Sequence, residues 1–136
     1  MTTSSTAKLI AVPREIARQI APEFASLAKR SNGRVTVATL ERDIVDGGLR
    51  VWAIADGPET LAWLLTSTYR APTGVQVFRI EAIVGRGRKR WLHLMQELVG
   101  HARAMGCSLV ECNARPGWRD EIPGLKHSAN FLEATL

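Results

Sequence analysis

The sequence predicts a single α/β (α+β) domain, in which a mixed, mostly antiparallel sheet carries N-terminal helices and a strand–loop–helix–strand parallel crossover. Apolar, partly β-branched runs at 49–55, 60–69 and 75–84 are separated by short turns containing Gly and Pro, a pattern typical of an antiparallel meander. An amphipathic stretch then leads to another apolar run at 107–113. A connection of this length implies that the strands on either side are parallel, with a right-handed crossover.

Residues 1–48 are expected to form a helical N-terminal part. Apolar residues recur there at helical spacing, namely Ile16, Ile20, Phe24 and Leu27. Pro22 lies inside this pattern and predicts a kink or two short helices. A second helix is expected at about 38–46, with Thr36 or Thr39 as its N-cap.

The strand at 75–84 is expected to be central, because one of its faces is apolar and the other is mixed. Strand alternation places Phe78, Ile80, Ala82 and Val84 on the apolar face, and Val75, Val77, Arg79, Glu81 and Ile83 on the mixed face. A helix should therefore cover the apolar face.

The clearest helix in the sequence follows at 91–105. Its apolar stripe consists of Trp91, Met95, Leu98, Ala102 and Met105. Gly106 is the expected C-cap. In the strand that follows, Cys107 and Cys112 are five residues apart, which points them to opposite faces and prevents them from pairing with each other.

Short strands are expected near both ends of the chain, at 8–12 and at 126–136, the latter after a short helix at 118–122. No linker or internal repeat divides the sequence. The prediction is therefore one domain spanning residues 1–136, in which residues 49–136 form the sheet and a loop at 85–91 precedes the long helix.

The composition favours an anionic partner, because the 136 residues carry a formal net charge of +5. No apolar run approaches the length of about 18 residues that a membrane span needs, and the N-terminal sequence lacks the features of a secretory signal. We therefore expect a protein of the cytoplasm, or one carried inside an assembly. No metal site is expected, because His93 and His101 lie about 12 Å apart along one helix.

A basic loop occupies the point where the long helix begins. It reads Gly85-Arg86-Gly87-Arg88-Lys89-Arg90, with four cations beside two glycines. Helix starts offer unpaired N–H groups and a partial positive charge, so anions bind there readily. Phosphate groups are the natural ligands for such a loop, and contact with the backbone of nucleic acid, without sequence reading, is one way of using it.

The order of the expected elements resembles that of the GNAT superfamily of acyl-CoA-dependent N-acetyltransferases, most strongly over residues 49–136. The family's cofactor pattern, Q/R-x-x-G-x-G/A, falls on residues 86–91, where Arg86 matches and Lys89 and Trp91 replace small residues. The resemblance implies a GNAT fold, acetyl-CoA as cofactor and an amine as acceptor. It also implies that cofactor-binding residues are Ile83, Val84, Gly85, Arg86, Gly87, Arg88, Lys89, Arg90 and Asn113.

Acetyl transfer of this kind requires a base near the acyl group, and the resemblance makes Glu81, on the central strand, the first candidate. Glu111 on the neighbouring strand is the second. The alternative for Glu81 is a structural pair with Arg79. The tyrosine that the family often uses late in the chain as an acid is absent, since the only tyrosine is Tyr69, although His127 is a candidate substitute.

A narrower resemblance connects the sequence with short GNAT-like proteins encoded by tailed phages. It rests on Leu-x-Val-Trp at 49–52, Trp91-Leu92, the Ala-Arg-x-x-Gly-Cys at 102–107 and Arg-Pro-Gly-Trp at 115–118. Two hypotheses follow. The protein is an N-acetyltransferase, or it is a non-catalytic GNAT-like virion or assembly protein, whose partners would be other phage proteins.

Overall fold

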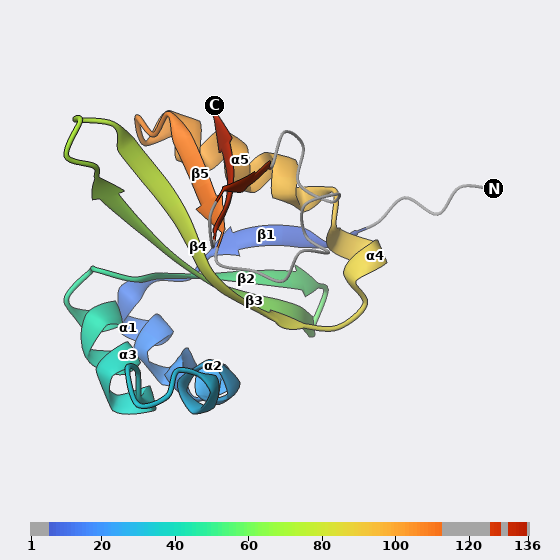
Figure 1. The fold of residues 1–136 in the computed structure, drawn as a ribbon. Coiled ribbons are helices and arrows are strands. Elements are labelled where there is room, and N and C mark those ends of the chain that lie inside the picture. The colour runs from blue at the N-terminus through green and yellow to red at the C-terminus, as the bar shows by residue number, and fades with distance from the viewer. Residues whose placement is uncertain (1–5, 113–125, 129–130, 136) are drawn as a thin grey trace.

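The computed structural model describes residues 6–112 with their side chains, and residues 126–128 and 131–135 by their backbone (Figure 1). The described strands form one seven-stranded sheet with the order β1-β2-β3-β4-β5-β7-β6. They are β1 (Lys8–Ala11), β2 (Arg50–Asp56), β3 (Glu59–Arg70), β4 (Gln76–Gly85), β5 (Leu109–Cys112), β6 (Lys126–Ser128) and β7 (Phe131–Thr135).

The strand pairing confirms the predicted fold class. Strands β1 to β4 pair antiparallel in sequence order, and β4 and β5 pair parallel, in register Val77↔Leu109 to Ile80↔Cys112. The prediction of one final strand at 126–136 was wrong, because β6 and β7 are two strands that pair antiparallel, and β7 lies between β5 and β6. The helix predicted at 118–122 lies outside the described residues.

The N-terminal helices are short and irregular, as Pro22 predicted. Helix α1 (Arg14–Ala17) continues into the 3-10 segment η1 (Arg18–Phe24), which contains Pro22, and then into α2 (Ala25–Arg30). Proline lacks the N–H that an α-helical hydrogen bond would use, so the tighter segment forms around it.

Helix α3 (Val37–Val45) begins with a reciprocal cap. The hydroxyl of Thr36 accepts a hydrogen bond from the backbone N–H of Thr39, and the hydroxyl of Thr39 accepts one from the N–H of Thr36. Both predicted candidates therefore take part in the cap, with Thr36 at the N-cap position.

A β-bulge in β4 changes the faces that its residues were expected to share. Ile80 pairs with Thr66 and Ala82 pairs with Leu65, so Glu81 is an extra residue opposite the β3 ladder. Phe78 and Ile80 consequently point into one core, whereas Ala82 and Val84 pack against the other core. The predicted single apolar face of 78, 80, 82 and 84 was wrong, since simple alternation fails at the extra residue.

The long helix predicted at 91–105 is broken into α4 (Arg88–Trp91) and α5 (Leu94–Ala104). Most of the predicted stripe is buried, but Met105 is 36% exposed and lies beyond the end of α5. Gly106 follows with a φ of +84°, which is the left-handed backbone that commonly ends a helix.

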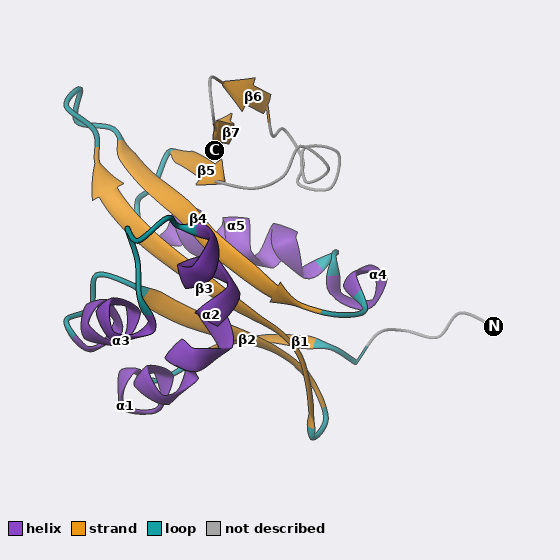
Figure 2. Cartoon of the chain, turned by 60° about the horizontal axis from the view of Figure 1, so that its bottom comes forward, coloured by secondary structure: helices purple, strands orange, loops and turns teal. Residues whose placement is uncertain are grey.

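Two cores lie on opposite faces of the sheet. One is formed by α4, α5 and the strands, and its members include Trp52, Phe78, Trp91 and Leu98. The other is formed by the N-terminal helices and includes Phe24, Leu40, Ile44, Val51 and Leu65. Figure 2 shows the N-terminal helices on one side of β2 to β4 and α5 on the other. None of the helices described for this chain is long and apolar enough to cross a membrane.

Candidate functional site

Glu81 lies on the central strand, next to the last described pair with its parallel neighbour. The last described pair between β4 and β5 is Ile80↔Cys112, and β4 continues to Gly85. Glu81 is therefore the bulged residue of β4 and follows directly on its last described pair with β5. A bulge re-aims a side chain and ends local pairing, and bulges are over-represented beside active sites.

A cross-strand network surrounds the Glu81 carboxylate. The Ser67 hydroxyl donates a hydrogen bond to Oε1 of Glu81 over 2.8 Å, and Nε of Arg79 lies 3.5 Å from the same oxygen. Within residues 6–112, no hydrogen bond reaches Oε2 of Glu81. The structural pair with Arg79 thus exists, and its 3.5 Å contact is to the oxygen that Ser67 also engages.

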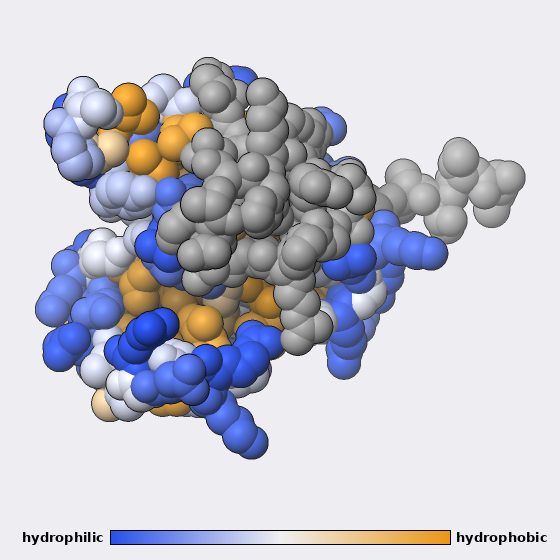
Figure 3. Space-filling view, viewed as in Figure 1, coloured by the Kyte–Doolittle hydropathy of each residue, from blue (hydrophilic) through white to orange (hydrophobic). Residues whose placement is uncertain are grey.

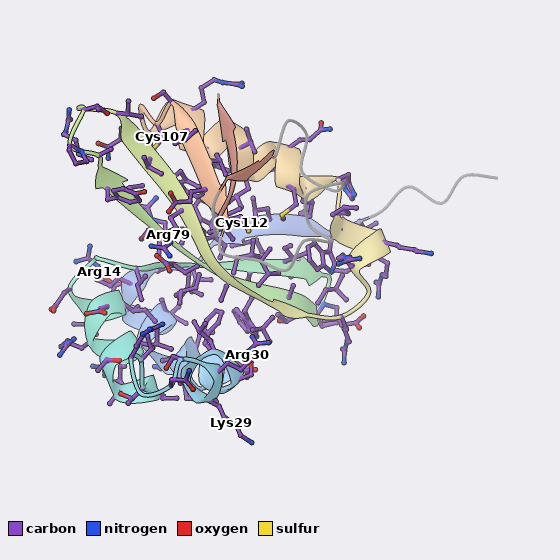
Figure 4. All side chains as sticks on the ribbon, in the orientation of Figure 1. Arg14, Lys29, Arg30, Arg79, Cys107 and Cys112 are labelled. Carbon is purple, nitrogen blue, oxygen red and sulfur yellow. The ribbon has the colours of Figure 1, made fainter. Side chains whose placement is uncertain are left out.

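Arg79 also contacts Glu111, the second predicted candidate. Its Nε atom lies 3.5 Å from Oε1 of Glu111, and the Tyr69 hydroxyl donates a hydrogen bond to Oε2 of Glu111 over 2.8 Å. The Glu111 side chain is only 10% exposed, compared with 28% for Arg79 and 26% for Glu81. Figure 4 labels Arg79 within this network.

The network lies on the face of the sheet that the N-terminal helices cover. Leu65 packs into the core beneath these helices, and strand alternation places Ser67 and Tyr69 on the same face as Leu65. Figure 3 shows apolar side chains open between the N-terminal helices and the strands on this side of the molecule. The charged groups therefore border an apolar surface.

The basic loop is fastened to the β2–β3 turn by ion pairs. Nη2 of Arg86 lies 2.9 Å from Oε1 of Glu59, and Nη2 of Arg90 lies 2.7 Å from Oδ2 of Asp56. The hydrogen bond from the Thr6 hydroxyl, followed by the one from Arg90, holds the pKa of the Asp56 carboxyl below its ordinary value. Two carboxylates thus offset two of the four loop cations.

Backbone packing fixes the start of the loop. The N–H of Arg86 donates to the carbonyl of Leu61, and a Cβ on Gly85 would lie 2.4 Å from Cβ of Ala62. The contact with β3 therefore requires glycine at position 85, whether or not a ligand binds to the loop. Gly87 has a φ of +63° and precedes α4, so its role is a turn that other residues rarely adopt.

Trp91 does not obstruct the surface of the loop. Its side chain is 2% exposed within the core that contains α5, and its Nε1 donates a hydrogen bond to the carbonyl of Arg86. The large residue at the last position of the cofactor pattern therefore holds the loop from inside. The substitution that remains at the surface is Lys89.

The positive charge of the loop suits a phosphate-bearing ligand, although carboxylates pair with two of the four cations that the sequence suggested for this role. Lys89 has no ion-pair or hydrogen-bond partner among residues 6–112, whereas Arg86 and Arg90 are paired with carboxylates. Ile83 and Val84 lie on β4 beyond its last described pair with β5. Asn113, the other predicted cofactor residue, lies outside the described residues.

The cysteines and histidines do not extend this site. The two cysteines were predicted to point to opposite faces of one strand, and this was wrong. Cys107 precedes β5, and both side chains lie in the same core. Neither forms a disulfide, as predicted. Burial raises the pKa of the Cys112 thiol to about 12, which keeps it protonated and poorly nucleophilic. His101 packs against the ring of Trp52, and no group of three metal-binding side chains occurs among the described residues. For His127 only the backbone, in β6, is described.

Sequence reasoning missed four members of these arrangements. Ser67 and Tyr69 reach Glu81 and Glu111 across the sheet, and Asp56 and Glu59 hold the basic loop. The turn at 56–59 did carry a signal, because two carboxylates stand there in a sequence rich in cations. The partners of Ser67 and Tyr69 depend on the register of β3, which the sequence does not reveal.

Comparison with known proteins adds evidence at the level of structure. No family model and no curated protein matches the sequence. Among solved structures, an aminoglycoside acetyltransferase from an uncultured soil metagenomic sample has a TM-score of 0.66 at 10% identity, over 91% of this chain and 92% of the other.

Two further solved structures have similar folds. The glucosamine-6-phosphate N-acetyltransferase of Arabidopsis thaliana gives a TM-score of 0.62 at 16% identity, over 91% of this chain and 94% of that one. The ribosomal-protein-alanine N-acetyltransferase of Brucella melitensis biovar Abortus 2308 gives 0.61 at 18% identity, over 85% and 84%. This chain therefore has the GNAT fold, the fold of acyl-CoA-dependent N-acetyltransferases.

Proposed function

We propose that this protein is an N-acetyltransferase that uses acetyl-CoA to acetylate a primary amine. The observation that carries the proposal is the position of Glu81. Its carboxylate stands on the bulge of β4, next to the last described pair with β5, with one oxygen held by Ser67 and the other without a hydrogen bond among residues 6–112. A fixed carboxylate with one oxygen available has the properties of a general base.

In this proposal each part of the site has one task. Acetyl-CoA, when bound, supplies an acyl thioester that can react with an amine. Oε2 of Glu81 accepts the proton that the amine must lose, and the backbone of Ile83 and Val84 lines the acyl donor. Gly87, Arg88 and Lys89 face its phosphates, while Arg86 and Arg90 hold the loop to the β2–β3 turn.

Binding of the acyl donor is tested by isothermal titration with acetyl-CoA and with CoA at low salt. We expect saturable binding that weakens in the double variant Arg88→Ala/Lys89→Ala, because charge next to phosphates is removed. The matched control is Lys29→Ala, which removes one cation whose side chain points away from the molecule at the end of α2 (Figure 4). Absence of heat at millimolar ligand would reject the cofactor.

Transfer is tested by following thiol release with a panel of primary amines. Glu81→Gln should lower kcat by about 100-fold or more, the usual contribution of a general base, and should leave the affinity for acetyl-CoA unchanged. Full activity of the Glu81→Gln variant would remove Glu81 from the catalytic role.

A second candidate is a non-catalytic role as a phage virion or assembly protein. The observation that favours it is the pairing of Arg86 and Arg90 with Glu59 and Asp56, which reduces the charge left for phosphates. Under this alternative, acetyl-CoA does not bind and no thiol is released with any amine, and the protein is found by mass spectrometry in purified particles.

A further inference from the structure

The contacts of Arg79 with two carboxylates suggest a role for Glu111 that differs from that of a second base. Nε of Arg79 lies at the same distance, 3.5 Å, from Oε1 of Glu81 and from Oε1 of Glu111. These two glutamates stand on adjacent strands, and Glu111 is directly opposite Arg79 in the β4–β5 register. One cation is therefore shared between two anions.

We propose that Glu111 is a positioning residue that draws Arg79 away from Glu81 and so leaves Oε2 of Glu81 available to accept a proton. The inference rests on the proposed function for its consequence in catalysis. The sharing of Arg79 itself does not depend on that function.

The burial of the three groups explains why sharing has an effect. The Glu111 side chain is 10% exposed and that of Arg79 is 28% exposed, so water screens their charges only in part. A guanidinium no longer drawn to Glu111 would be able to form with Glu81 the two-pronged pair that arginine prefers. That pair would engage both oxygens of the base.

The fixed geometry of Glu111 makes it suitable for this role. Its Oε2 accepts the hydrogen bond of Tyr69 and its Oε1 faces Arg79, so each oxygen has its own partner. Tyr69 stands on β3 and Glu111 on β5, on either side of Arg79 in β4. Tyr69 therefore holds the Glu111 carboxylate beside Nε of Arg79.

The kinetic test compares Glu111→Gln with the double variant Arg79→Gln/Glu111→Gln. Glutamine keeps the shape of Glu111 and its oxygen can still accept from Tyr69, while an NH2 group, which cannot accept from Arg79, takes the place of the other oxygen. We expect kcat to fall by about tenfold while KM for acetyl-CoA stays unchanged, because Arg79 then pairs fully with Glu81. Removing Arg79 as well should restore part of the lost activity.

Residues of one ion-pair network couple with either sign, and removing a buried cation that has lost a partner can itself restore stability. The variants are therefore compared at a temperature where urea unfolding shows all of them to be fully folded, so that a gain in kcat reports on the site. The control is Arg42→Gln, which removes an exposed arginine paired with Asp43 on α3. Unchanged kcat in Glu111→Gln, or a double variant no more active than the single one, would overturn the proposal.

A nuclear magnetic resonance measurement tests the sharing without any transfer activity. The Nε–H signal of Arg79 is identified by its loss in Arg79→Gln. We expect Glu81→Gln and Glu111→Gln each to shift this signal, and a signal that either variant leaves in place would overturn the shared contact. If wild-type protein acetylates no amine, the proposed function fails, and the shared contact is still decided by this measurement.

Discussion

At the residue scale, the two glycines of the basic loop illustrate how one motif can have separate causes. Gly87 permits a left-handed turn, whereas Gly85 permits β4 to approach β3, with the Leu61 carbonyl 2.6 Å from where a Cβ would lie. The sequence shows two glycines beside cations and suggests a phosphate cradle. The structure assigns one of them to strand packing, which no local pattern could reveal.

Gly85→Ala should therefore destabilise the fold whether or not a ligand binds. The added methyl group meets backbone and the Cβ of Ala62, neither of which can swing away, and we expect a loss of about 1–3 kcal/mol of unfolding free energy in urea. The control is Gly100→Ala in α5, where nothing lies within 4 Å of the new Cβ. That variant should be more stable by about 0.5–1 kcal/mol, and a Gly85→Ala protein of wild-type stability would contradict the packing argument.

At the element scale, the strands and the parallel crossover could be predicted because their signals are local. Turn residues and alternating apolar residues identify β2, β3 and β4, and the length of the connection identifies the β4–β5 pairing. The bulge at Glu81 could not be predicted, since it depends on which β3 residue faces Ile80 and Ala82. Of the site, the places of Glu81 and Glu111 on neighbouring strands were predicted, and their roles stay predictions. Ser67 and Tyr69, 14 and 42 residues away from their partners, could not be predicted.

The connection between the basic loop and the β2–β3 turn gives a prediction at this scale. In Asp56→Asn/Glu59→Gln, the carboxylates that offset Arg86 and Arg90 become neutral. We expect CoA to bind more tightly, and the gain should shrink as salt is added, because the Debye length is about 10 Å at 0.1 M ionic strength. Titration calorimetry at two salt concentrations measures both effects.

The matched control neutralises two carboxylates on α3, in Glu41→Gln/Asp43→Asn, which makes the same change of net charge far from the loop. A gain in the control of equal size would assign the effect to overall charge. Weaker binding in Asp56→Asn/Glu59→Gln would show instead that the ion pairs shape the loop for its ligand.

At the scale of the whole molecule, one sheet separates two cores, so each core depends on the same strands. Leu40 belongs to the core beneath the N-terminal helices and Leu98 to the core beneath α5. Because β2, β3 and β4 contribute side chains to both, we expect the described part of the chain to unfold as one unit.

The prediction is that Leu40→Ala and Leu98→Ala each lower the stability seen by both far-ultraviolet circular dichroism and tryptophan fluorescence. The expected loss is about 2–5 kcal/mol for each variant, as is usual for deleting a buried leucine side chain. Trp63 packs against the core beneath the N-terminal helices, whereas Trp52 and Trp91 belong to the core beneath α5. Fluorescence therefore reports on both cores. Separate transitions by the two probes in Leu40→Ala would show that the helical N-terminal part unfolds independently.

The bulge in β4 also has a consequence for anyone who diversifies this protein in the laboratory. Ile80 and Ala82 are two positions apart and would ordinarily be randomised together as neighbours on one surface. Here they face opposite sides of the sheet, so a library designed on simple alternation would change side chains in two separate cores at once. Deleting Glu81 would make Ile80 and Ala82 adjacent in a regular strand, in which they still face opposite cores, so the deletion removes the candidate base without turning Ala82 to the other side.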